Sequence, residues 1–445
     1  MATDLLSIGR SGATAARIAL DLTAQNIANA ATEGYVRRSA RLEEIAPASG
    51  PGLIDEVSLS GVRFAGIVRN ADVFRQAEVR RTGSDAARAD AEVAGLTDIE
   101  AGVEQSQLYP ALVKFEASLG QLAADPVDPS LREAVVEDAR TAARSFTIAS
   151  GALDAVGEGL RFEAADGVSQ INLIAGELAK TNLRLARSSD AGSDRTALLD
   201  QRDALLERLS GFANISTVIA PDQTVQVSLG GSGGAQLVGP AAATPFASTT
   251  AADGTIAFTL GTSPVALAGG ALAGKAQALV TLADMRGRID TLAGTLIATA
   301  NAAQAGGVAL DGSSGQPLFT GTGAADIAVA LTSGAQLATA PAGAPEGSRD
   351  PANLNALRTA LANAGVVDQA DAALFSISSA VAGRTVTRDA LDTIAGSARA
   401  AFDAQSGVDL DAEAVNLIRF QQAFQASGRA MQVASTLFDT ILSIR

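Results

Sequence analysis

Residues 408–445 carry the pattern that most restricts what this chain can fold into. Two rows of residues recur at intervals of seven: Leu410, Leu417, Phe424, Met431 and Phe438 in one, and Phe420, Ser427, Ala434 and Ile441 in the other. This spacing is typical of a helix that buries one narrow seam against another helix. Asp409 or Asp411 is expected to cap its start. Ordering such a helix costs about 1–2 kcal/mol per residue, more than its own seam returns, so it needs a partner.

The opposite end of the chain offers that partner. In residues 3–30 one row of seven-residue spacing contains Leu5, Gly12, Ala19 and Asn26, and a second contains Ile8, Ala15, Leu22 and Asn29. Small residues fill much of this face, so another helix can approach closely. We expect the helix to end by Gly34. The same periodicity is equally typical of an ordinary surface helix, and periodicity alone does not separate the two interpretations.

Composition narrows the function classes. A chain of 445 residues is too long for one compact core and predicts two or more domains. The net charge of −15, without a basic run, argues against nucleic acid or an anionic membrane as a partner. The absence of His and Cys removes the usual metal ligands, catalytic triads and disulfides. We therefore expect no cofactor and no catalytic or metal-binding residue. No targeting or membrane segment is expected either.

An enzyme that uses its Asp and Glu side chains as acids and bases is the alternative to a structural protein. The chain contains 48 such residues, but no pair of them stands at a spacing that singles it out. The sequence therefore favours a protein without catalytic activity.

The middle of the chain alternates between helical and β patterns. Helices are predicted over 70–107 with a break at Tyr109-Pro110, from Asp128-Pro129 to about 185, from Leu198 to about 211, over 275–305, after Asp350-Pro351, and over 369–405. The helix over 275–305 is expected to point one seam inward, formed by Leu279, Leu282, Ile289, Leu292 and Leu296. Hairpins are predicted within 215–229 and 253–260, a further strand at 236–238, and short strands at 318–319 and 327–329.

One stretch has the spacing of a phosphate-binding loop. Gly269 and Gly274-Lys275 fit the pattern, but Ala276 stands where Ser or Thr would bind magnesium, and no βαβ repeat surrounds it. Nucleotide binding is therefore discarded.

These patterns predict a mainly α, extended protein of several domains. The N- and C-terminal helices pair as a coiled coil, a long helical bundle forms a stem, and a β-rich region is inserted into it as an outer part (α+β). The expected divisions are 1–35 with 408–445 for the terminal pair, 36–69 for an extended linker, 70–211 with 270–305 and 350–407 for the stem, and 212–269 with 306–349 for the β-rich part.

Three separated motifs resemble one protein family. Residues Gln25-Asn26-Ile27-Ala28-Asn29, running on to Gly34-Tyr35, resemble the N-terminal signature of the bacterial flagellar rod and hook family. The hexamer Leu198-Leu199-Asp200-Gln201-Arg202-Asp203 resembles an internal motif of its hook-associated members. Near the C-terminus, Arg419-Phe420-Gln421-Gln422 favours the same members. The run Gly407-Val408-Asp409-Leu410-Asp411-Ala412-Glu413-Ala414 and the pair Phe438-Asp439 match as well. The β-rich part resembles no motif of that family.

The resemblance implies a structural protein of the bacterial flagellum that forms the junction between hook and filament. The implied partners are further copies of the same chain in the axial structure, the hook protein, the second junction protein on the filament side, and an export chaperone. The implied location is extracellular, reached by flagellar type III export without a cleavable signal peptide. A hook or rod axial protein of the same family is the alternative.

The terminal seams are the expected assembly and chaperone interface. Its predicted residues are Leu5, Ile8, Ala15, Leu22, Asn26, Asn29, Leu410, Leu417, Phe420, Phe424, Met431, Phe438 and Ile441.

Overall fold

The computed structural model describes residues 2–32, 34–45, 61–188, 193–231 and 233–443, with described side chains from Leu5 to Thr440. The chain divides into two compact units. Unit 1 comprises Met1–Ser84, Ile171–Pro245 and Asp392–Arg445, and unit 2 comprises Asp85–Gln170 and Phe246–Leu391. The mainly helical fold with a strand-containing insertion is confirmed. The division into four parts stays a prediction.

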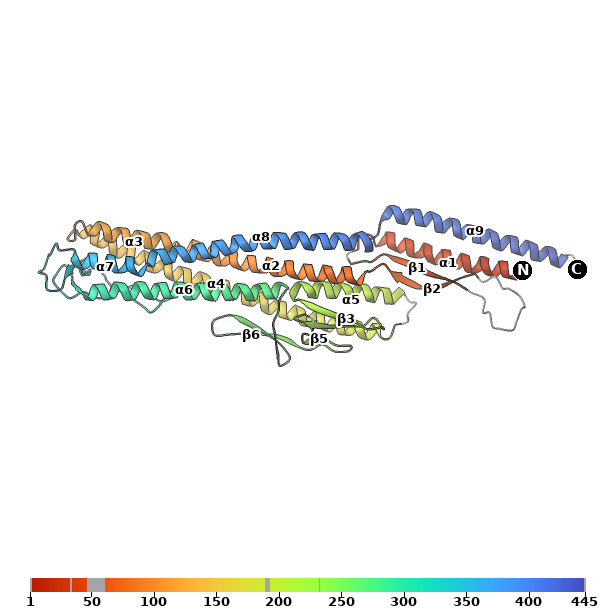
Figure 1. Ribbon diagram of the computed structural model, residues 1–445, viewed down its shortest axis with the longest axis horizontal. Coiled ribbons are helices and arrows are strands. Elements are labelled where there is room, and N and C mark those ends of the chain that lie inside the picture. The colour runs from red at the N-terminus through yellow and green to blue at the C-terminus, as the bar shows by residue number, and fades with distance from the viewer. Residues whose placement is uncertain (1, 33, 46–60, 189–192, 232, 444–445) are drawn as a thin grey trace. The chain divides into compact units, whose positions relative to one another are not determined.

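Long helices make up most of both units (Figure 1). They are α1 (Ala2–Ala28), α2 (Val73–Gln105), α3 (Leu108–Leu122), α4 (Pro129–Leu185), α5 (Ser193–Phe212), α6 (Ala271–Ala305), α7 (Ala352–Ala364), α8 (Val366–Ser406) and α9 (Leu410–Ser443).

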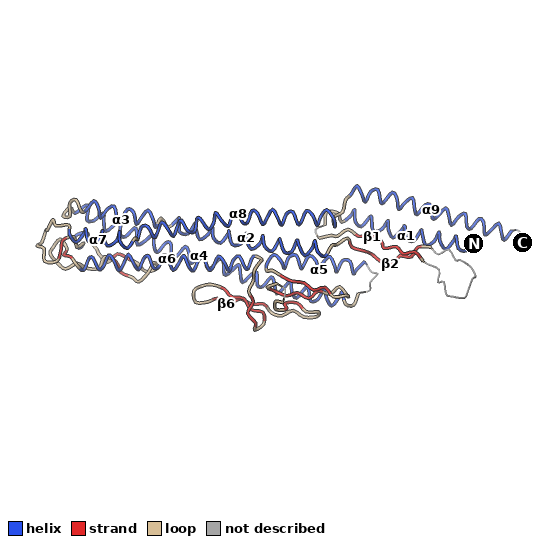
Figure 2. The backbone as a smooth tube through the Cα atoms, in the orientation of Figure 1, coloured by secondary structure: helices blue, strands red, loops and turns tan. Residues whose placement is uncertain are grey.

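The strands form short antiparallel sheets (Figure 2). In unit 1 these are β1 (Arg38–Glu44) with β2 (Val62–Arg69), and β3 (Ile215–Ile219), β4 (Val225–Leu229) and β5 (Gln236–Val238) in that order. In unit 2 they are β6 (Phe246–Thr250), β7 (Ile256–Leu260) and β8 (Ser263–Val265), and the pairs β9 (Gly307–Val308) with β12 (Ala340–Pro341) and β10 (Phe319–Thr320) with β11 (Ala328–Val329).

In unit 1, α1 is packed by α9 and by the β1–β2 hairpin, as Figures 1 and 2 show. The two helices run antiparallel, since Gly9 lies against Met431, Gly12 against Ser427, and Asn26 against Glu413. The predicted pairing of the two ends is therefore confirmed. Glycine suits this face because a Cβ at Gly9 would lie 2.7 Å from Cγ of Met431.

The β3–β5 sheet is fastened to the end of α4 by one buried amide. Asn182 donates to the carbonyl oxygens of Val225 (2.8 Å) and Gly239 (3.1 Å) and accepts from the backbone N–H of Val225 (2.9 Å). A buried amide with its bonds satisfied fixes which residue of β4 meets the helix. The predicted hairpin around residues 220–223 is confirmed, with Ile215 opposite Leu229.

Unit 2 has a continuous apolar core between α2, α3, α4, α6, α7 and the first half of α8. The seam predicted for the helix over 275–305 is confirmed, because Leu279, Leu282, Ile289, Leu292 and Leu296 are all buried there. Phe115 and Phe319 meet edge to face with their ring centres 6.0 Å apart. Hydrophobic burial on this scale stabilises unit 2 without specifying a particular register.

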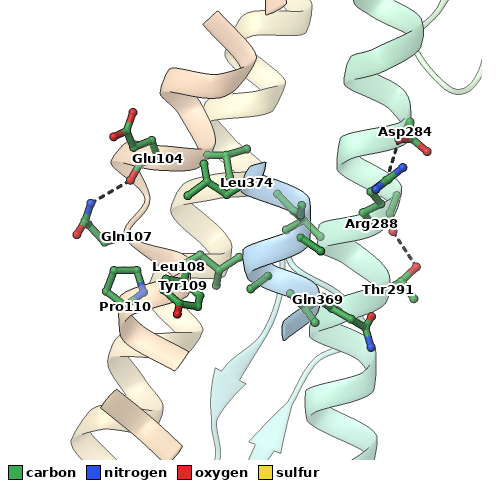
Figure 3. A pocket seen from close by; sticks show the side chains of 17 residues that line it. Glu104, Gln107, Leu108, Tyr109, Pro110, Asp284, Arg288, Thr291, Gln369 and Leu374 are labelled. Atoms are coloured by element: carbon green, nitrogen blue, oxygen red, sulfur yellow. Dashed lines mark hydrogen bonds and ion pairs between the residues drawn. The ribbon is translucent and has the colours of Figure 1, made fainter. Parts of the chain in front are cut away.

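The break in the second long helix was predicted at the wrong residue. Helix α2 ends at Gln105, and Gln107 adopts the left-handed conformation with φ 54°. Figure 3 shows the side chain of Gln107 donating back to the carbonyl oxygen of Glu104 (3.0 Å). Pro110 instead lies in the first turn of α3, where its missing N–H leaves no helical hydrogen bond unmade.

Two helix starts also differ from those predicted. Helix α5 begins at Ser193, five residues before Leu198, with Asp194 in its first turn, where a negative charge suits the helix dipole. Helix α6 begins at Ala271, so Gly274 and Lys275 lie inside it. A Cβ at Gly274 would lie 2.2 Å from the carbonyl oxygen of Arg88, so this glycine serves close packing of α6 against α2.

The remaining predicted elements agree closely with the structure. Asp128 caps α4 by accepting from the backbone N–H groups of Ser130 (2.8 Å) and Leu131 (2.9 Å). Asp409, rather than Asp411, caps α9 in the same way. Within the predicted linker over 36–69, the described residues form the β1–β2 hairpin, and residues 46–60 lie outside the described ones.

Candidate assembly interface

The paired faces of α1 and α9 contain most of the residues predicted for the interface. On α1, Ala15, Leu22 and Asn26 are buried and Ile8 is half-buried, whereas Leu5 is exposed. On α9, the seam residues Leu417, Phe420 and Met431 are half-buried, and Leu410, Phe424 and Phe438 are exposed. Ile441 lies in α9, but its side chain is outside the described ones.

Asn29 forms its side-chain hydrogen bonds within the end of its own segment. Its amide donates to the carbonyl oxygen of Gln25 (2.9 Å), and its side-chain oxygen accepts from the hydroxyl of Thr32 (3.3 Å). Both bonds are local and stabilise the C-terminal end of α1 and the turn that follows it. The two asparagines of the N-terminal motif therefore differ: Asn29 forms local hydrogen bonds, whereas Asn26 forms hydrogen bonds to other segments.

Asn26 connects α1 to three other segments. Its amide nitrogen donates to the carbonyl oxygen of Arg38 (2.9 Å) and to Oε2 of Glu413 on α9 (3.2 Å). Its side-chain oxygen accepts from the backbone N–H of Arg38 (3.0 Å) and from the hydroxyl of Tyr35 (2.9 Å). All these bonds are made at a side chain that is 1% exposed, so each of them is shielded from water.

Glu413 is the acidic member of this node and is itself 1% exposed. A buried carboxylate needs a cation, and Arg37 supplies one with Nε 2.6 Å from Oε1 of Glu413. Because Glu413 lies on α9 and Arg37 follows α1, the ion pair fixes the register of the two helices.

The hexamer on α5 joins the same node. The guanidinium of Arg38 pairs with Asp200 (2.7 Å), and that of Arg69 pairs with both Asp200 (2.7 Å) and Asp203 (2.8 Å). Arg202 completes the cluster by pairing with Asp203 (2.7 Å). The three motifs found separately in the sequence therefore meet in one polar cluster of unit 1, which we call the polar node. We define it as Asn26, Tyr35, Arg37, Arg38, Arg69, Asp200, Arg202, Asp203 and Glu413.

Charge and burial set the protonation of the node. Burial raises the pKa of Asp203, but the charges of Arg202 and Arg69 and their hydrogen bonds outweigh it and hold the pKa below its ordinary value. Burial also raises the pKa of the Tyr35 phenol, and the charge of Arg38, 4.9 Å from the ring centre, offsets this only in part. At neutral pH Asp203 is therefore ionised, and the phenol of Tyr35 keeps its proton and donates it to Asn26.

A second surface of α9 faces away from α1 and is apolar as well. Val415, Ile418, Val433 and Leu437 are spaced on that side of the helix and are between 46% and 65% exposed. The predictions missed this outer face, because the seven-residue rows drew attention to the seam alone. We call these four residues the outer face of α9.

Neither a metal site nor a membrane span emerges from the part of the chain that the structure describes. The Asp and Glu side chains of that part form no group of three or more placed to hold a metal ion. None of its helices is both long and apolar enough to cross a lipid bilayer.

Unit 2 contains a cavity of about 650 Å³ beside the break between α2 and α3 (Figure 3). Leu108, Tyr109 and Leu374 lie on its apolar side, and Arg288, paired with Asp284 (2.8 Å), lies on its rim. No predicted interface residue lines it.

Comparison with known families places both ends of the chain among flagellar axial proteins. Residues 6–35 match the family model described as flagella basal body rod protein. Residues 399–444 match that of the C-terminal part of the flagellar basal body rod FlgEFG proteins. Both terminal segments of the chain are thus similar in sequence to parts of flagellar rod proteins.

The family assignment rests on the middle of the chain. Residues 95–319, just over half of the chain, match the model described as the flagellar hook-associated protein FlgK helical domain. The chain belongs to the flagellar hook-associated protein FlgK family.

Curated relatives agree with this family. Flagellar hook-associated protein 1 of Bacillus subtilis (strain 168) is 28% identical over 217 residues, which are 47% of this chain and 43% of the relative. Flagellar hook-associated protein 1 of Salmonella typhimurium is 25% identical over 231 residues, 51% of this chain and 41% of the relative. The matched part of the chain thus spans less than half the length of these relatives.

Among solved structures, the flagellar hook junction protein FlgK from Burkholderia pseudomallei matches with a TM-score of 0.49 and 23% identity. The match covers 55% of this chain and 46% of that one. At this score the likeness adds nothing to the family assignment, which rests on the family models.

Proposed function

We propose that this protein is a structural subunit of the bacterial flagellum at the junction between hook and filament, and that it assembles through its terminal helices. The observation that carries the proposal is the outer face of α9. The seam of α9 is occupied by α1 of the same chain, yet four apolar side chains remain exposed on the other side. Exposed apolar surface of this kind marks a site for another protein.

Further copies of the same chain are the first proposed occupants of that face. The hook protein on one side and a second junction protein on the other are the neighbours that the family membership suggests. No residue has a catalytic role in this proposal. Export to the outside of the cell through the flagellar channel, without a cleavable signal peptide, is proposed on the same ground.

An export chaperone is the proposed partner before assembly. An exposed apolar helix face would otherwise promote premature self-association, and a helix laid along that face would cover it. The proposed surface includes both the outer face and the exposed seam residues Phe424 and Phe438.

Substitutions on the two faces of α9 test the proposal. Val433→Asp places a charge on the outer face, where Val433 is 59% exposed, so the free subunit should fold normally. Burial of that charge between subunits would cost several kcal/mol, and cells carrying the variant should have hooks without filaments. The matched control is Gln421→Asp, which places the same charge on an exposed polar position of the same helix, outside the groove that Val433 and Leu437 line. Normal filaments on cells with Val433→Asp would contradict the proposed role of the outer face.

Deletion of the gene separates the junction role from the alternative of a hook or rod protein, which the matches at both termini keep open. Hooks that lack filaments are expected for a junction protein. Cells without hooks would assign the chain to the hook or rod instead.

A further inference from the structure

Arg80 on α2 is a buried cation without an ion-pair partner in the described part of the chain. It is 8% exposed, and its guanidinium makes a single long hydrogen bond, 3.4 Å, to the hydroxyl of Thr217. Burial lowers the pKa of Arg80, although an arginine remains charged at neutral pH. Because a buried charge costs several kcal/mol unless it is paired, Arg80 requires an explanation.

The side chain of Arg80 lines a cavity of about 440 Å³ that lies wholly within unit 1. Val79, Ala204 and Phe402 give this cavity apolar walls, and Tyr35 and Ser406 lie among its polar ones. Its volume falls within the range of about 300–1,000 Å³ that is usual for small-molecule sites. A ligand that suits it combines an apolar body with one anionic group.

The carboxylates of the protein that line the cavity are engaged elsewhere. Asp203 accepts from Arg69 (2.8 Å), Gln76 (2.9 Å) and Arg202 (2.7 Å). Glu207 and Asp403 both pair with Arg399. The charges of Asp203 and Glu207 act on the guanidinium of Arg80, but both carboxylates are bonded to other groups and neither forms an ion pair with it.

We propose that this cavity binds a small monocarboxylate, with its carboxylate on the guanidinium of Arg80 and its apolar body against Val79, Ala204 and Phe402. The planar guanidinium offers two parallel N–H groups to a carboxylate, which is the strongest pairing available to it. Glu207 and Asp403 lie in the same wall. Their negative charge opposes a doubly charged phosphate or sulfate more than a singly charged carboxylate.

Titration of the full-length protein with hexanoate in a calorimeter tests this directly. We expect saturable binding, and a saturable rise of a few degrees in melting temperature with hexanoate, compared with sodium chloride at equal ionic strength. Acetate should bind more weakly, because it lacks the apolar body. Absence of hexanoate binding, or tighter binding of phosphate or sulfate than of hexanoate, would overturn the proposal.

Variants at the site complete the test. Arg80→Met keeps the length of the side chain and removes the charge, so hexanoate binding should disappear while the melting temperature in chloride stays the same or rises. Arg75→Met removes an exposed arginine from the same helix and should bind hexanoate as the unchanged protein does. Hexanoate binding by Arg80→Met at full affinity would refute the role of Arg80.

A second variant leaves Arg80 in place. Ala204→Phe fills the cavity from an exposed residue of its wall, so the protein should still fold. Loss of hexanoate binding in Ala204→Phe locates the ligand in the cavity. Retention of binding in this variant would show that hexanoate binds elsewhere and would overturn the proposal.

Discussion

In the core of unit 2, helices pack through fully buried Leu, Ile and Phe side chains, whereas at the polar node α1 and α9 meet through Asn26 and Glu413. The apolar core stabilises in proportion to the area it buries and tolerates small shifts of one helix along another. The polar node loses its hydrogen bonds if either helix slides by one residue. The comparison shows that the core of unit 2 contributes mainly stability, whereas the polar node fixes the register of α1 against α9.

Each region can be observed separately because the chain has two tyrosines and no tryptophan. Tyr35 belongs to unit 1 and Tyr109 to unit 2. Tyr109→Phe therefore leaves a fluorescence probe of unit 1, and Tyr35→Phe leaves a probe of unit 2. Equal shifts of both probes in any variant below would show that the two units unfold together.

The largest effect is expected from the one arginine that the core of unit 2 encloses. Arg132 is 1% exposed and donates to the carbonyl oxygens of Pro126 (2.6 Å), Gly334 (3.1 Å) and Leu337 (2.8 Å) and to the hydroxyl of Thr339. Arg132→Met removes these four hydrogen bonds, and each buried acceptor that is left without a partner costs about 1–3 kcal/mol. We expect the free energy of unfolding of unit 2 to fall by roughly 3–5 kcal/mol, measured by urea unfolding of the Tyr35→Phe protein.

The control for this variant is Arg288→Met in the same unit. Arg288 forms an exposed pair with Asp284 within α6, so its loss should cost less than about 1 kcal/mol. If Arg132→Met cost no more than Arg288→Met, the loop between β11 and β12 would not depend on the buried guanidinium.

A substitution in the polar node should lower the free energy of unfolding less than the loss of Arg132 does, and its effect should be confined to unit 1. Asn26→Ala removes the group that joins Tyr35, Arg38 and Glu413, and we expect a loss of roughly 2–3 kcal/mol in unit 1. Urea unfolding of the Tyr109→Phe protein measures it, and hydrogen exchange should show weaker protection in α1. Asn29→Ala is the matched control, since Asn29 bonds only within its own helix end. Equal losses from the two substitutions would mean that the node does not hold α1 to α9.

These two regions also differ in how far the sequence predicts them. Helical periodicity predicted both the core of α6 and the seam of α9, because apolar burial repeats with the helix. The polar node was missed, since its members come from α1, α5, α9 and the β1–β2 hairpin and share no spacing. One signal was available: Glu413 stands at a seam position of α9, where a charge requires a buried cation. The outer face of α9 was missed because Val415, Ile418, Val433 and Leu437 are irregularly spaced along the chain.

Acid should weaken unit 1 through Asp203. Its pKa in the folded protein lies below the ordinary value of about 3.9, so its stabilising contribution is full above that value and is lost as the pH falls through the folded pKa. In unit 2, burial raises the pKa of Glu116, and the nearby charge of Asp368 raises it further. Glu116 therefore stabilises unit 2 fully at a pH below its pKa in the unfolded chain. This stabilisation is lost as the pH rises through its pKa in the folded protein.

Thermal unfolding between pH 7 and pH 3 measures this difference with the two tyrosine probes. The ratio of the stability of unit 2 to that of unit 1 should rise toward acid. Asp203→Asn should flatten the acid dependence at the Tyr35 probe, and Glu116→Gln should flatten the opposing trend at the Tyr109 probe. An unchanged acid dependence of unit 1 in Asp203→Asn would assign it to other carboxylates.

The smallest effect concerns how closely α1 and α9 approach each other. Replacing a helical glycine by alanine normally stabilises by roughly 0.5–1 kcal/mol, and Gly428→Ala on α9 should gain this, because no atom lies within 4 Å of the added Cβ. At Gly9 on α1 the same methyl group would lie 2.7 Å from Cγ of Met431 and 3.3 Å from the carbonyl oxygen of Ser427. The side chain of Met431 can turn away, but the backbone of Ser427 cannot, so Gly9→Ala should lose the gain and α9 should shift outward. We expect a difference of about 1–2 kcal/mol between the two variants, measured by thermal unfolding of the Tyr109→Phe protein. If Gly9→Ala and Gly428→Ala stabilised the protein equally, α1 and α9 would lie far enough apart to accept a side chain at position 9. The polar node alone would then fix the register of the two helices.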